Sequence, residues 1–109
     1  MLSNSEVPRK KSSLRKEKLK LDWFVYADRD EDGVWYYVGS GSLRRVNNPK
    51  RNGLHKKAMI KKGFRRIVLF ATDDEEVARE VERYYVETLH TYINDPLAPP
   101  HAANLRNYG

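Results

Sequence analysis

Two tyrosines in aromatic segments are the first candidates for chemistry in this sequence. Tyr26 and Tyr37 lie eleven residues apart, within the segments Trp23–Ala27 and Val34–Gly39. A phenol can exchange a proton, but its reference pKa of about 10 leaves little phenolate at neutral pH unless nearby cations lower that value. From the residues alone, we interpret both side chains as cross-strand aromatics that pack within a sheet.

The patterns of several other enzyme classes do not occur in the sequence. It contains no cysteine, which excludes disulfides, thiolate metal sites and cysteine nucleophiles. No glycine-rich phosphate-binding loop ends in Lys-Ser or Lys-Thr, and no paired-histidine zinc motif is present. Ser40 and Ser42 lack the surroundings that would make either hydroxyl a nucleophile. The sequence therefore gives these classes no support.

Basic residues gather in one part of the chain, whose net charge is +6. The segment from residue 44 to residue 66 contains no acid, so its like charges would repel one another without an anionic partner. A nucleic-acid backbone is the simplest such partner, and a solvated face that keeps the protein soluble is the alternative. The basic side chains of this segment are Arg44, Arg45, Lys50, Arg51, Lys56, Lys57, Lys61, Lys62, Arg65 and Arg66.

The length of 109 residues fits one domain. Residues 1–20 are rich in serine, lysine and arginine and poor in aromatics, so we expect a basic, flexible tail before a domain at 21–109. The sequence holds no apolar run long enough to span a membrane and no secretory signal. We expect a cytoplasmic protein that does not associate with membranes.

The arrangement of apolar and turn residues predicts a small α+β fold. Trp23–Ala27 and Val34–Gly39 are expected to form a hairpin around the turn Asp28–Gly33, because Asp-Gly is a strong turn signal. Arg65–Ala71 is expected to form a buried third strand. The predicted order is β-β-α-β-α, a three-stranded antiparallel sheet flanked by helices.

Helices are expected between and after the strands. Thr72 and Glu75 form a capping-box pattern at the start of a long helix that would run to about Tyr92. Shorter helical segments are expected from Leu43 to about Asn48 and from His55 to Lys62. The apolar face of the long helix would consist of Val77, Val81, Tyr84, Tyr85 and Leu89.

The order of these residues resembles that of the GIY-YIG nucleases. Phe24–Tyr26 and Tyr37–Gly39 resemble the family's two signature tripeptides, with Phe24 in place of the first glycine. The segment Tyr37–Arg45 resembles the one that carries the family's arginine. Ala78 followed by Glu82 resembles its metal-binding helix, and Asn104–Gly109 resembles its C-terminal asparagine motif. The resemblance covers residues 22–109.

This resemblance implies a DNA endonuclease that hydrolyses phosphodiester bonds with a single metal ion. Glu82 would bind Mg²⁺, or Mn²⁺ in its place, because hard cations prefer carboxylate oxygens. Tyr37 would act as the general base with Tyr26 beside it, and Arg45 would hold the scissile phosphate. The products would carry a 5′ phosphate and a 3′ hydroxyl.

Further residues receive roles from the same resemblance. His55 would orient water or shuttle a proton, and a surface histidine near DNA is the alternative. Asn104 would anchor the C-terminal segment against the site through its side-chain hydrogen bonds. Arg44 adjoins Arg45, and the spacing leaves either one as the phosphate-binding arginine. The residues expected to contact the DNA backbone are Arg44, Lys50, Arg51, Lys56 and Lys57.

Two other functions remain open at the level of sequence. The same fold would serve as a module that binds nucleic acid without cutting it, or as a protein whose basic tail contacts an acidic protein surface. The chain is short for a separate sequence-reading domain, so we expect low specificity, recognition of structured or branched DNA, dimer formation or help from a partner. The resemblance favours a phage or bacterial source.

Overall fold

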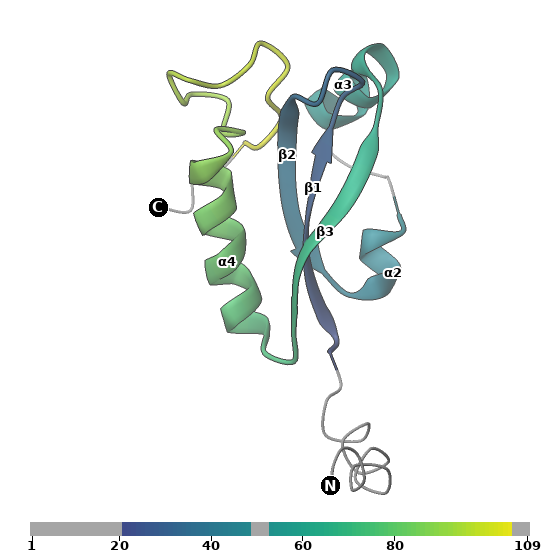
Figure 1. The fold of residues 1–109 in the computed structure, drawn as a ribbon, viewed down its shortest axis with the longest axis vertical. Helices are drawn as coiled ribbons and strands as arrows, with labels where there is room; N and C mark the ends of the chain where they lie inside the picture. Colours follow the sequence, from purple (N-terminus) through teal and green to yellow (C-terminus); the bar gives the residue numbers. More distant parts are fainter. Residues whose placement is uncertain (1–20, 49–52, 106–109) are drawn as a thin grey trace, which may run out of the picture.

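The computed structural model describes residues 21–48 and 53–105. It has an α+β fold around an open antiparallel sheet, whose strand order is β2-β1-β3 (Figure 1). The predicted basic tail, Lys50, Arg51 and the last part of the asparagine motif lie outside the described residues. The bounds of the elements are β1 (Trp23–Arg29), β2 (Trp35–Gly41), α2 (Leu43–Val46), α3 (Gly53–Lys62), β3 (Arg65–Thr72) and α4 (Glu75–Thr88).

The first strand extends further than predicted. β1 continues through Asp28 and Arg29, which were assigned to the turn, because these residues pair with both neighbouring strands. The turn itself is fixed by Asp30, whose carboxylate accepts hydrogen bonds from the backbone N–H groups of Asp32 (2.8 Å) and Val34 (2.9 Å). Since side chains alternate along a strand, Asp28 lies on the same face of the sheet as Tyr26.

The longest helix covers the opposite face of the sheet. Figure 1 shows α4 alongside the strands, and the core forms where its Ala78 and Val86 pack against Val25, Ala27 and Val38. These five side chains are fully or almost fully buried. Aromatic and β-branched residues suit such a half-buried strand surface, which explains why the strand predictions from sequence were close.

Both ends of α4 differ from the prediction. The N-cap is Asp74 rather than Thr72, because the Asp74 carboxylate accepts hydrogen bonds from the N–H groups of Glu76 and Val77. The helix ends at Thr88 and not near Tyr92. Tyr84, expected on the apolar face, is 60% exposed.

The third strand is half-exposed rather than buried. β3 lies at the edge of the sheet, and its Val68 is 48% exposed. Both short helices form where the sequence predicts them, so the order is β-β-α-α-β-α; the predicted order β-β-α-β-α counted the two as one. α2 begins after Ser42, whose hydroxyl accepts a hydrogen bond from Arg45 N–H.

The segment after α4 covers the outer edge of β2. The N–H of Ala103 donates to Tyr36 O at 2.8 Å, and the Asn104 side chain bonds to both backbone groups of Val38. Edge strands expose unpaired backbone groups, and this segment satisfies several of them. Among the described residues, no helix is long and apolar enough to cross a membrane.

Candidate active site

The two tyrosines meet on the face of the sheet opposite α4. The Tyr26 and Tyr37 ring centroids are 6.4 Å apart, and Tyr26 pairs in register with Gly39. A Cβ atom at Gly39 would lie 2.5 Å from the Tyr26 hydroxyl oxygen. The Tyr26 ring therefore crosses β2 directly over this glycine. Tyr26 is fully buried, whereas Tyr37 is half-buried.

Three consecutive residues at the end of β2 contact three of the predicted site residues. Gly39 lies under Tyr26, and a Cβ atom at Gly41 would fall 2.5 Å from Arg45 Cδ. Between them, the Ser40 hydroxyl donates a hydrogen bond of 2.5 Å to Glu82 Oε1. The geometry thus brings the predicted tyrosine, arginine and glutamate to one strand end.

Glu82 reaches this strand end from the α4 side of the sheet. Ser40 points away from the face that carries its two glycine neighbours, because side chains alternate along a strand. Glu82 is 9% exposed, and its hydrogen-bond partner is on β2, which is an edge strand of the sheet. A cavity of about 270 Å³ borders this edge, and its lining includes Ser40, Gly41 and Arg45.

The oxygen donors at this edge suit a hard divalent cation. Glu82 supplies a carboxylate and Ser40 a hydroxyl, and within residues 21–48 and 53–105 no cluster of three or more histidine, cysteine or acidic residues exists. Mg²⁺ often binds through one or two carboxylates and keeps several water ligands. The donor set is compatible with a cation that Glu82 holds and that keeps most of its water ligands.

A buried carboxylate that the sequence reasoning missed lies at the centre of the tyrosine face. Asp28 is fully buried, and Arg66 donates to it twice, from Nε at 2.7 Å and from Nη2 at 2.8 Å. The Asp28 Oδ2 atom also lies 2.7 Å from His55 Nε2. The alternation of Phe24, Tyr26 and Asp28 is the sequence signal that would have placed Asp28 on this face.

The charge of Asp28 is maintained by its partners. Burial by itself would raise the pKa of Asp28, but the hydrogen bonds from Arg66 and His55 and their charges lower it below the ordinary value. Burial likewise acts against the charge of Arg66, yet Asp28 raises the pKa of that guanidinium. The Asp28–Arg66 ion pair is therefore charged throughout the neutral range.

His55 lies inside the protein, which excludes the surface histidine considered as an alternative. Its side chain is fully buried and stacks on the Tyr37 ring, with centroids 3.9 Å apart and an interplanar angle of 12°. The Arg66 guanidinium lies over the Tyr26 ring at 4.2 Å from its centroid. Each tyrosine is thus in contact with one partner of Asp28.

Asn104 holds β2 in place from the outer edge of the strand. Its Oδ1 atom accepts from Val38 N (2.8 Å) and from the Thr91 hydroxyl (2.7 Å), while its Nδ2 donates to Val38 O (2.8 Å). Only 5% of the Asn104 surface is exposed, and its side chain holds the β2 backbone at Val38, next to Gly39.

The predicted DNA-contacting residues lie in several places. Arg44 and Arg45 follow β2 on α2, and both are exposed. Lys56 and Lys57 are exposed on α3, which carries His55 on its inner side. α3 therefore contacts Tyr37 through its buried His55 and carries the positive charge of Lys56 and Lys57 on its exposed side.

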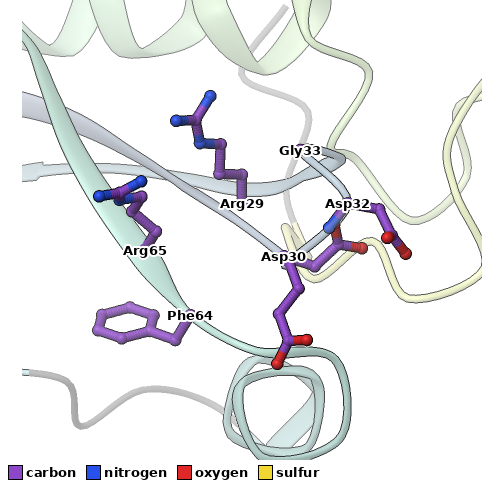
Figure 2. Close-up of a pocket in the computed structure, with 7 residues that line it drawn as sticks. Arg29, Asp30, Asp32, Gly33, Phe64 and Arg65 are labelled. Atoms are coloured by element: carbon purple, nitrogen blue, oxygen red, sulfur yellow. The ribbon is translucent and has the colours of Figure 1, made fainter.

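A larger cavity lies away from the predicted residues, at the β1–β2 turn. It measures about 500 Å³ and is lined by Arg29, Asp30, Glu31, Asp32, Gly33, Phe64 and Arg65. Figure 2 shows the two arginine side chains on one side of this cavity and the carboxylates of the turn on the other. Acidic and basic side chains both line this cavity, so its charge favours neither an anion nor a cation.

Comparison with models of known protein families, with curated proteins and with solved structures finds no match for this chain. The three-stranded antiparallel sheet and its helices are consistent with a small GIY-YIG-like domain. Sequence order and local geometry are therefore the basis for a functional proposal.

Proposed function

We propose that this chain is a metal-dependent DNA endonuclease of the GIY-YIG type. The observation that carries the proposal is the convergence at Gly39–Gly41, where consecutive residues contact Tyr26, Glu82 and Arg45. Glu82 and Arg45 answer two needs of phosphodiester hydrolysis, an anionic metal ligand and a cation for the phosphate. The third need is a proton acceptor, which we assign to Tyr37, the neighbour of Tyr26 on the same face of the sheet.

The proposed reaction is attack of water on the scissile phosphorus. Tyr37 acts as the general base toward the attacking water, while the guanidinium of Arg45 binds the phosphate oxygens and stabilises their increasing charge. The bond to the 3′ oxygen breaks and this oxygen takes a proton from solvent, which leaves a 3′ hydroxyl and a 5′ phosphate. A Mg²⁺ or Mn²⁺ ion at Glu82 would act as a Lewis acid toward the developing negative charge.

Tyr26 and Tyr37 take different parts in this proposal. Tyr37 is half-buried and therefore open to an attacking water, whereas Tyr26 is fully buried. Tyr26 serves as a hydrogen-bonding neighbour whose hydroxyl lies over Gly39. Arg45 takes the phosphate in preference to Arg44, because Arg45 is the one whose side chain contacts the strand end at Gly41.

DNA is the proposed partner because basic side chains surround this face. Arg44, Lys56 and Lys57 are exposed on the helices next to the site and would bind phosphate groups without reading bases. Structured or branched DNA is the proposed substrate, with a dimer as one means of cutting both strands. The proposed location is the cytoplasm of a bacterial or phage-infected cell.

The proposal is tested by incubating supercoiled plasmid with the purified protein and Mg²⁺, Mn²⁺ or EDTA. We expect nicking with either metal and none with EDTA. Tyr37→Phe should lower the nicking rate by about 10²- to 10⁴-fold, the usual contribution of a general base. Tyr84→Phe is the matched control, because Tyr84 is 60% exposed on the outer side of α4.

A module that binds DNA without cutting is the second candidate. It is favoured by the full burial of Tyr26 and His55 and by the Glu82 carboxylate bonding to Ser40. Buried and hydrogen-bonded side chains of this kind are equally suited to stabilising the fold without taking part in a reaction. Tight, salt-sensitive DNA binding with no nicking under either metal would replace the nuclease proposal with this one.

A further inference from the structure

Asp28 is a fully buried carboxylate that the proposed reaction does not use directly. Burying a charge is costly, so a chain keeps one only where partners and geometry compensate. The carboxylate contacts Arg66 on one side and His55 on the other. We propose that Asp28 and Arg66 are positioning residues that hold Tyr26 and Tyr37 in their reactive arrangement. This inference rests on the proposed nuclease function.

Arg66 is fixed by contacts in three directions. Its Nε and Nη2 atoms form the two hydrogen bonds to Asp28, and its Nη1 donates to Val46 O at 2.7 Å. Its guanidinium lies over the Tyr26 ring. A planar, forked donor can make all of these contacts at once, and a lysine ammonium cannot. Arg66 therefore connects β1, the end of α2 and the first tyrosine.

Asp28 also contacts His55, which in turn stacks on Tyr37. The 2.7 Å contact between His55 Nε2 and Asp28 Oδ2 fixes the imidazole in the plane in which it stacks on Tyr37. Asp28 is also the cross-strand partner of Tyr37 in the register of β1 and β2. One carboxylate thus holds a cation against Tyr26 and an imidazole against Tyr37.

The charge of Arg66 is maintained by the same contacts. Although burial lowers the pKa of Arg66, the hydrogen bonds to Asp28 and the negative charge of Asp28 raise it above the ordinary value. The guanidinium therefore stays charged and keeps its contacts with Asp28 and with the Tyr26 ring.

Arg66→Lys is the variant that tests this inference, because it keeps the charge but loses the fork. We expect kcat for plasmid nicking to fall by about 10- to 100-fold, as for a misplaced reacting group, with KM within about twofold of wild type. Arg65→Lys is the matched control, since Arg65 is the exposed neighbour on the same strand. Arg65→Lys should leave both constants unchanged.

The free energy of unfolding of each variant is also measured, because Arg66→Lys alters a buried ion pair. The Arg66→Lys and Arg65→Lys proteins are assayed at temperatures below their thermal unfolding midpoints. If Arg66→Lys does not fold, the double variant Asp28→Asn/Arg66→Gln replaces the ion pair by a neutral hydrogen-bonded pair and should show the same loss of kcat. A folded variant with wild-type kcat, or one in which only KM rises, would overturn the inference. Absence of nicking by wild type would instead overturn the proposed function, and this inference with it.

Discussion

Gly39 and Gly41 determine how closely the site side chains approach β2. Each glycine lies where a Cβ atom would come within 2.5 Å of a site residue, Tyr26 in one case and Arg45 in the other. The missing side chains allow a phenol and an arginine to lie directly against the backbone. The arrangement of the candidate site therefore depends on the absence of a side chain at Gly39 and at Gly41.

Gly39→Ala should therefore displace the Tyr26 ring. We expect the nicking rate to fall by about 10²-fold, because the new methyl group forces a shift of reacting groups. Overpacking should also lower the free energy of unfolding by about 1–3 kcal/mol. Plasmid nicking and urea unfolding measure the two effects.

Gly53→Ala is the control for this substitution, because no atom of residues 21–48 or 53–105 beyond the helix's own backbone lies within 4 Å of a Cβ atom at Gly53. It should retain wild-type nicking and change stability by no more than about 1 kcal/mol. Equal activity of the Gly39 and Gly53 variants would mean that the position of Tyr26 does not matter for the reaction.

At the scale of elements, regular patterns could be predicted and irregular contacts could not. Runs of aromatic and β-branched residues, bounded by turn signals, placed all three strands within a few residues. The role of Asp28 was missed because its partners His55 and Arg66 are far away in sequence. The helix cap was misplaced because Thr72 and Asp74 both offer a suitable side-chain oxygen.

The C-terminal segment has no regular structure, yet it completes the sheet. Sequence reasoning expected Asn104 to anchor this segment, and the hydrogen bonds to Val38 give that expectation a specific form. No periodicity could have shown that the segment covers the edge of β2 beside Gly39. The contact depends on how the chain turns after α4, where His90 has a positive φ of 55°.

Asn104→Ala should loosen β2 from this edge. The substitution leaves the buried N–H and C=O groups of Val38 without their side-chain partner, and we expect a loss of about 2–4 kcal/mol in unfolding free energy. Amide exchange at Val38 should also become faster. Asn94→Ala is the control, because Asn94 is exposed and bonds only to the Tyr92 hydroxyl among the described residues. Unchanged exchange at Val38 would contradict the anchoring role.

At the scale of the whole molecule, buried and paired carboxylates set the response to acid. The pKa values of Asp28, Asp30 and Asp95 are all lower than the ordinary value. For Asp28 and Asp30, burial opposes this and hydrogen bonds outweigh it; for Asp95, the backbone hydrogen bond from Leu97 is the main cause. Folding therefore favours the charged form of each group.

The sign of the pH effect follows from these depressed values. The unfolded chain, with aspartate pKa values of about 3.9, takes up protons before the folded chain does. The stabilisation is complete above about pH 5 and is lost as the pH falls through the unfolded value and then through the lower folded values. We expect the urea midpoint to decrease steadily below this pH. A midpoint that stays constant down to pH 2 would contradict the assigned pairings.

The most direct test of the nuclease proposal compares Glu82→Gln with Glu80→Gln in Mg²⁺-dependent plasmid nicking. Both substitutions remove one negative charge from α4, but only Glu82 is buried and bonded to Ser40. We predict that Glu82→Gln abolishes nicking while the protein stays folded and still binds DNA, and that Glu80→Gln cuts like wild type. Full metal-dependent nicking by a folded Glu82→Gln protein would contradict the proposed site.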